Sequence, residues 1–128
     1  MPASYRERMA VREADDRLIE LEADAAGWKA ASALLSEMWH HHRLPTSFLL
    51  LVHSRAIQQR MWMLARTDDQ HERAQMLANI YHQLTCELVA EMVAHGVDAH
   101  ALASAVQRMR AAHRTLASAV SGADLGFS

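Results

Sequence analysis

Cysteine, proline and glycine are all scarce in this chain. Its 128 residues include one cysteine, two prolines and four glycines, while 51% are hydrophobic and 22% are charged. So few chain breakers in so apolar a sequence argue against a disordered or β-rich chain and favour a helical globule. Because Cys86 has no second cysteine to pair with, an intrachain disulfide is excluded and a reducing compartment is expected.

The sequence also lacks long apolar runs and an excess of basic charge. Its longest apolar runs, residues 48–52 and 61–65, are far shorter than the roughly 20 residues that cross a bilayer. The amino-terminal residues are charged and contain no apolar leader segment. The formal net charge of -2 gives the whole molecule no general attraction to nucleic acid or to an anionic membrane. We therefore expect a cytoplasmic protein that binds neither.

No sequence signature of catalysis is present. The chain contains no glycine-rich phosphate loop, no Gly-x-Ser-x-Gly nucleophile elbow and no His-Glu-x-x-His zinc motif. Covalent haem attachment through Cys-x-x-Cys-His is excluded by the single cysteine. The sequence therefore predicts a protein that is not an enzyme.

Periodic apolar residues and helix-end signals predict an all-α, single-domain protein, an up-and-down bundle of four to five helices. Ser4 and Glu7 have the spacing of a capping box, and Gly96 is placed to end a helix in the left-handed conformation. Gly27 is expected to break the first helical region, because a glycine inside a helix costs about 1 kcal/mol relative to alanine. The predicted helices span residues 5–26, 28–43, 46–66, 68–95 and 98–120, with a frayed tail at 121–128.

The segment 45–66 is predicted to be the central helix, on which the others pack. One of its stripes has the 3.6-residue spacing of a core-facing side. That stripe consists of Leu50, His53, Ile57, Met61 and Leu64. Further apolar residues, including Phe48 and Trp62, fall roughly opposite to it. A helix that is apolar on two sides is usually buried on both or covered by a second chain.

Charge and surplus apolar residues together predict a protein-binding surface. Residues 28–66 carry five basic side chains and one acidic, whereas residues 67–98 carry one basic and six acidic, so the two segments can lie side by side. Either the bundle buries all the apolar residues internally, or the protein is an adaptor, regulator or chaperone-like module that binds another protein or forms a homodimer. The predicted partner-binding residues are Phe48, Leu51, Val52, Arg55, Trp62, Met63 and Arg66, with Arg60 contributing to specificity.

Two histidines on otherwise apolar stripes support an alternative function. If turns lie near residues 67 and 96, helix hairpins place His53 and His113 in one layer, close to Tyr81 and His82. Such histidines are most often core residues that bond to a carbonyl or hydroxyl group. The functional alternative is a site for a transition metal or haem, formed by His53 and His113 with His82. The primary prediction includes no cofactor and no metal.

Overall fold

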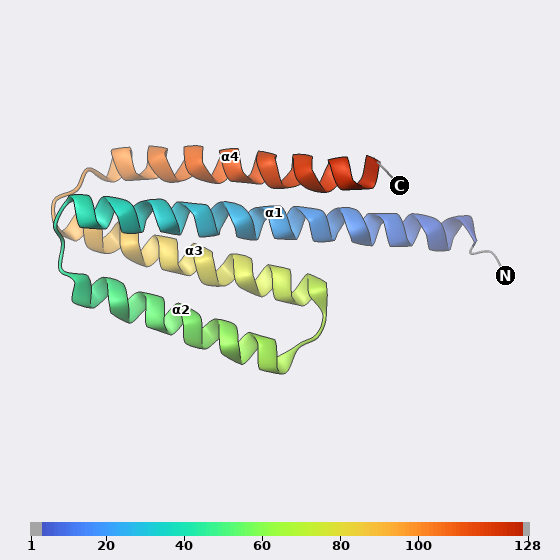
Figure 1. The fold of residues 1–128 in the computed structure, drawn as a ribbon, viewed down its shortest axis with the longest axis horizontal. Coiled ribbons are helices and arrows are strands. Elements are labelled where there is room, and N and C mark those ends of the chain that lie inside the picture. The colour runs from blue at the N-terminus through green and yellow to red at the C-terminus, as the bar shows by residue number, and fades with distance from the viewer. Residues whose placement is uncertain (1–3, 127–128) are drawn as a thin grey trace.

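Four helices make up the described part of the protein. The computed structural model describes residues 4–126, with their side chains except those of Ser118 and residues 120–126. The helices are α1 (Tyr5–His41), α2 (Thr46–Arg66), α3 (Gln70–Ala94) and α4 (Ala99–Gly126), and these residues contain no strand. The all-α prediction is therefore confirmed, with four helices that form a single body (Figure 1).

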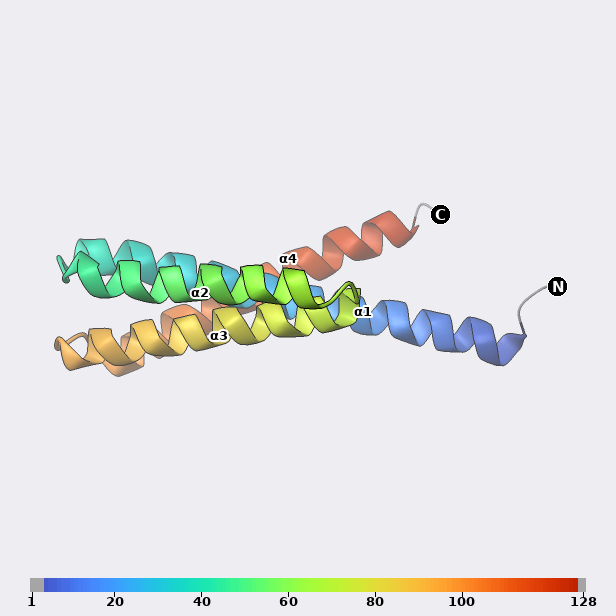
Figure 2. The same cartoon turned by 90° about the horizontal axis from the view of Figure 1, so that it is seen from below.

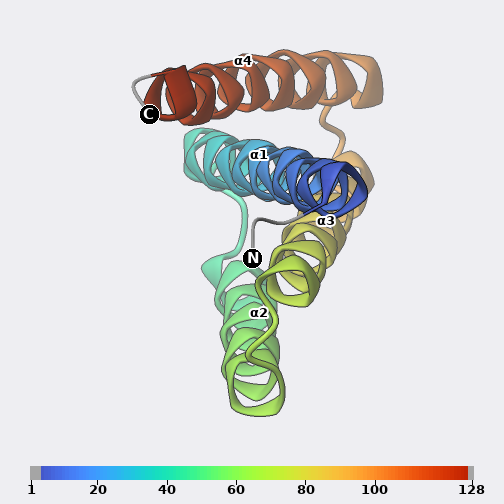
Figure 3. The same cartoon turned by 90° about the vertical axis from the view of Figure 1, so that its right-hand side faces the viewer.

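Helix α1 lies between its neighbours, and α2 lies at an edge. Successive helices run in opposite directions (Figure 1). Seen from one end, α4 and α2 lie on opposite sides of α1 (Figure 3). Helix α1 packs extensively on α3 and on α4, whereas α2 packs mainly on α3. The regular packing of an up-and-down bundle is therefore not confirmed, because α2 diverges from α1 over most of its length.

One hydrophobic core joins all four helices near the turn between α1 and α2. Trp39 is the largest of its fully buried side chains. The indole Nε1 of Trp39 donates a hydrogen bond of 3.1 Å to the carbonyl oxygen of Pro45, and its ring stacks on Phe48 with 5.7 Å between the ring centroids. These contacts hold the start of α2 against the end of α1. The other core residues are Ala31, Leu35, Leu49, Val52, Leu84, Leu88, Met92, Leu102 and Val106.

Helix α1 continues through Gly27, so the predicted break between residues 26 and 28 is wrong. A Cβ atom on residue 27 would lie 2.9 Å from the carbonyl oxygen of Arg110 and 3.0 Å from its Cγ atom. The missing side chain therefore allows the backbone of α4 to approach α1 closely. This packing between helices offsets the helix-propensity cost of glycine, which is about 1 kcal/mol.

The central helix is α1, and the prediction that residues 45–66 form the centre is wrong. The buried residues of α1 are mostly small, which permits close approach by two neighbouring helices. They are Ala23, Ala25, Gly27, Ala31, Ser32, Leu35 and Trp39. Helix α2, the more apolar of the two, buries only Leu49, Val52 and Met63.

Several predicted helix ends are confirmed. The amide of Glu7 donates to the Ser4 hydroxyl at 3.2 Å and the Ser4 amide donates to the Glu7 carboxylate at 3.1 Å, which completes the capping box. Gly96 has a φ of 91° after the end of α3. Helix α4 continues to Gly126, so the predicted frayed tail is helical over residues 121–126, and residues 127–128 lie outside the described part.

The first part of α1 extends beyond the ends of α2 and α3 (Figure 2). Nearly all side chains of residues 5–17, here called the amino-terminal arm, are exposed. Near the base of the arm, the Nε2 atom of His71 lies 2.7 Å from the carbonyl oxygen of Ala14, which places the start of α3 beside that residue. The body of the protein therefore begins close to Ala14.

Candidate binding surface on helix α2

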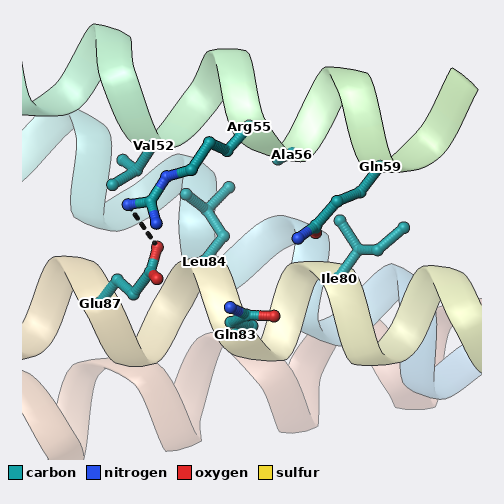
Figure 4. A pocket seen from close by; sticks show the side chains of 8 residues that line it. All are labelled: Val52, Arg55, Ala56, Gln59, Ile80, Gln83, Leu84 and Glu87. Atoms are coloured by element: carbon teal, nitrogen blue, oxygen red, sulfur yellow. Dashed lines mark hydrogen bonds and ion pairs between the residues drawn. The ribbon is translucent and has the colours of Figure 1, made fainter. Parts of the chain in front are cut away.

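The side of α2 that faces α3 is closed around Arg55 and Glu87, and further along an open pocket of about 230 Å³ lies between Trp62 of α2 and Ile80 of α3. Val52 and Leu84 pack between the two helices, and the Arg55 guanidinium lies 3.4 Å from the Glu87 carboxylate (Figure 4). Only about 10 Å³ of empty space remains beside this charged pair, which is too little for a ligand larger than water. The charged pair confirms that basic α2 and acidic α3 lie side by side.

The outward side of α2 is apolar and exposed. Leu50, Ile57, Met61 and Leu64, here called the α2 stripe, are 66%, 60%, 66% and 45% exposed. The prediction that this stripe faces the core is therefore wrong. The buried residues Leu49, Val52 and Met63 lie on the opposite side of the helix, because α3 covers that side.

The predicted partner-binding residues divide into an exposed group and a buried group. Leu51 and Trp62 are 55% and 53% exposed, and Arg55 and Arg66 are also exposed. The Arg66 guanidinium stacks on the Trp62 ring at 4.5 Å from its centroid. These two residues therefore already contact each other within the chain.

The buried group is not available to a partner in this structure. Val52 and Met63 are 1% and 0% exposed, and Phe48 is partly buried against Trp39. These three side chains therefore contribute little or no exposed surface here, and their role in partner binding stays a prediction. Apolar residues on both sides of α2 look alike in the sequence, so hydrophobicity alone does not separate the covered side from the open one.

A cleft opens where α2 diverges from α1. Its volume is about 230 Å³, and residues of α1, α2 and α3 line it. Basic groups stand on two of these helices, Lys29 on α1 and Arg60 on α2, and no lining residue is acidic. The other lining residues are Ser32, Ala33, His53, Ala56, Ile57, Ile80, Tyr81 and Leu84. Ile57 belongs to both this α1–α2 cleft and the α2 stripe, so the two features form one continuous surface.

His53 joins the wall of the cleft to α1. Its Nε2 atom lies 3.0 Å from the Ser36 hydroxyl oxygen, and that hydroxyl donates its own proton to the Ser32 carbonyl oxygen at 3.0 Å. The Ser36 oxygen must therefore accept a hydrogen bond from Nε2–H of His53, which leaves Nδ1 as an acceptor in the neutral ring. Burial lowers the pKa of His53 from its ordinary value of 6.5, because desolvation disfavours the charged ring.

The three histidines of the alternative prediction do not share a layer. His53 contacts α1 through Ser36, the His82 ring lies against Trp28 with 4.2 Å between ring centroids, and His113 is exposed on α4. Helices α2 and α4 are on opposite sides of α1 (Figure 3), which separates His53 from His113. Among the described residues, no three His, Cys, Asp or Glu side chains group as a metal site would require. The geometric basis of the metal or haem alternative is therefore wrong.

The sequence patterns do not single out Lys29 as a site residue. It is the only lysine in the chain, and it stands among small residues of α1, including Ser32 and Ala33. Small residues opposite a diverging helix leave space, and this is the signal that could have indicated the cleft.

No protein-family model, curated protein or solved structure matches this chain. Within residues 4–126, no helix combines the length and the apolar character needed to cross a membrane.

Proposed function

We propose that the protein is an interaction module in which α2 receives an amphipathic helix of a partner protein. The observation that carries this proposal is the exposure of six large apolar side chains on one 21-residue helix. They are Leu50, Leu51, Ile57, Met61, Trp62 and Leu64. Four of them, Leu50, Ile57, Met61 and Leu64, share one face of α2, and an exposed apolar face commonly marks an interaction site.

The packing of α2 supports a helix as the occupant. Helix α2 is covered by α3 on one side, whereas the α2 stripe and the adjoining α1–α2 cleft are open. An apolar face with residues at i, i+7, i+11 and i+14 suits a second helix that lies along it. A partner helix in this position would cover Ile57 and Met61 and fill the space beside α1.

Charge favours an acidic partner over a second copy of α2. Helix α2 contains three arginines and no acidic residue. Arg55 pairs with Glu87 and Arg66 stacks on Trp62, whereas Arg60 forms no ion pair with any side chain that the structure describes. Two copies of α2 placed face to face would bring like charges together, which opposes a symmetric dimer through this helix. Carboxylates that flank the apolar face of the partner would meet Arg60 and the neighbouring Lys29.

Two synthetic helical peptides test this proposal. They have the same length and the same leucine stripe, but one is flanked by glutamates and the other by lysines. We expect fluorescence anisotropy with the full chain to show saturable binding of the glutamate peptide and weaker binding of the lysine peptide. Ile57→Ser should weaken binding of the glutamate peptide about tenfold or more, because a central apolar contact is lost.

Matched variants control this experiment. Gln58→Ser changes an exposed polar residue on the same helix, and Arg108→Glu reverses a charge on α4, so neither should alter peptide binding. Arg60→Glu should reverse the preference between the two peptides. Equal binding of both peptides, or unchanged binding by Ile57→Ser, would contradict the proposal. A second copy of the chain is the other possible occupant of the α2 stripe. Light scattering of the chain alone at several concentrations detects it, because such a dimer would be stable and Ile57→Ser would dissociate it.

A further inference from the structure

The α1–α2 cleft combines an apolar interior with unpaired positive charge. Ile80 and Leu84, which are 9% and 3% exposed, belong to α3, and Ile57 and Ala56 of α2 face the same space. Within the described residues, neither Lys29 nor Arg60 takes part in an ion pair, and no carboxylate lines the cleft. Two cations beside apolar walls are complementary to an anion that carries a hydrocarbon body.

Polar groups of the cleft can also contact such an anion directly. The Tyr81 hydroxyl makes no hydrogen bond to another group in residues 4–126 and is free to donate one. His53 donates its Nε2–H to Ser36, so its Nδ1 atom is an acceptor in the neutral ring and offers no donor to an anion. The cleft therefore offers donors from three helices, namely Lys29, Tyr81 and Arg60.

The size of the cleft limits what it can hold. Its volume of about 230 Å³ is below the roughly 300 to 1,000 Å³ of sites that enclose drug-sized ligands. A short hydrocarbon chain or a single aromatic ring fits this space, whereas a nucleotide or a haem does not. The absence of a second polar cluster in the lining also argues against a polyanion.

We propose that the α1–α2 cleft binds a small monocarboxylate with an apolar body, its carboxylate held between Lys29 of α1 and Arg60 of α2. The hydrocarbon part lies against Ile57, Ile80 and Leu84. The bound carboxylate adds a link between α1 and α2 to the one that His53 makes with Ser36. This inference goes beyond the proposed function and does not rest on it.

Titration of the full-length protein with octanoate tests this site. Chemical-shift changes in amide NMR spectra should be saturable and centred on Lys29, Arg60 and Tyr81. Octanol, which has the same chain without the charge, and acetate, which has the charge without the chain, should each bind at least about tenfold more weakly. Lys29→Gln and Arg60→Gln should each weaken octanoate binding about tenfold, because each removes one charge-assisted contact. Arg108→Gln on α4 removes a cation elsewhere and should have no effect.

A variant that fills the cleft tests whether octanoate binding needs the volume of the cleft as well as its two cations. Ala33 is exposed on α1, so Ala33→Leu should leave the protein folded and keep both cations while it blocks octanoate. If octanol bound as tightly as octanoate, the two cations would contribute nothing to affinity. If acetate bound as tightly as octanoate, the apolar walls would contribute nothing. Either result would overturn the proposal, as would shifts that do not saturate or do not respond to Arg60→Gln. The glutamate peptide is measured on the same protein, and octanoate should compete with it because both would contact Lys29 and Arg60. Saturable peptide binding that depends on Leu50, Met61 and Leu64, which do not line the cleft, stands as a separate result if octanoate fails to bind.

Discussion

Helices α1 and α2 differ in a way that their composition does not suggest. Helix α1 carries many charged residues and little apolar periodicity, yet it lies between α3 and α4 and contributes the largest fully buried side chain, Trp39. Helix α2 is richer in large apolar residues, yet most of them are exposed at an edge. Small residues such as Gly27 and Ala31 allow two neighbours to approach α1. Central position in this fold therefore follows from how closely helices approach, and hydrophobicity alone does not determine it.

Trp39 of α1 and Trp62 of α2 give the largest contrast between these helices. Trp39→Ala removes a fully buried ring that also bonds to Pro45, so we expect the free energy of unfolding to fall by about 3–5 kcal/mol. Trp62→Ala removes a ring that is 53% exposed, and its cost should stay below about 1 kcal/mol. Urea denaturation followed by circular dichroism measures both. Equal losses would mean that the Trp62 ring is buried in solution as fully as the Trp39 ring.

Gly27 tests the close approach of α1 and α4, with a smaller expected effect. Gly27→Ala gains about 1 kcal/mol in helix propensity. The added methyl group would meet the Arg110 backbone at 2.9 Å, and such overpacking typically costs about 1–3 kcal/mol. We therefore expect a net loss of up to about 2 kcal/mol in the free energy of unfolding. A gain of stability would contradict the contact between the two helices, because propensity alone would then decide the outcome.

The pH dependence of stability tests how α2 is attached to α1, and its effect should be the smallest. The pKa of His53 is lowered in the folded state by burial, so the unfolded chain takes up a proton first as the pH falls through about 6.5. The stability contributed by neutral His53 is thus present above this pH and is lost as the pH falls towards the folded-state pKa. Urea denaturation across this range should show the loss, and His53→Gln should reduce it. A pH profile that His53→Gln leaves unchanged would mean that His53 is solvated.

Helix caps and helix ends could be predicted from the sequence, whereas the face of α2 that is covered could not. The Ser4–Glu7 capping box, the bounds of α2 and the turn at Gly96 depend on neighbouring residues only, and each is confirmed. The burial of Val52 and the exposure of Ile57 depend on where α3 packs, and both sides of α2 are apolar. Gly27 gave a misleading local signal, because the contact that favours it comes from α4.

The histidine layer failed for a related reason. Residue spacing and turn positions predict that His53 and His113 lie at matching heights along their helices. Matching heights do not determine on which side of α1 each helix packs. With α1 between α2 and α4, the two rings cannot meet. The small residues around Lys29 were the only sequence signal for the α1–α2 cleft, because the divergence of the two helices is a property of the whole fold.

The amino-terminal arm gives one continuous helix two different stabilities. Residues 5–17 have almost no neighbours outside α1, and an isolated helix of fewer than about 12–15 residues is marginal in water. Local opening of the arm therefore costs far less free energy than opening of the segment around Trp39. Its amide hydrogens should exchange with solvent much earlier than those of the packed part of α1. The change in exchange rate should fall near Ala14, where His71 makes the first contact from α3.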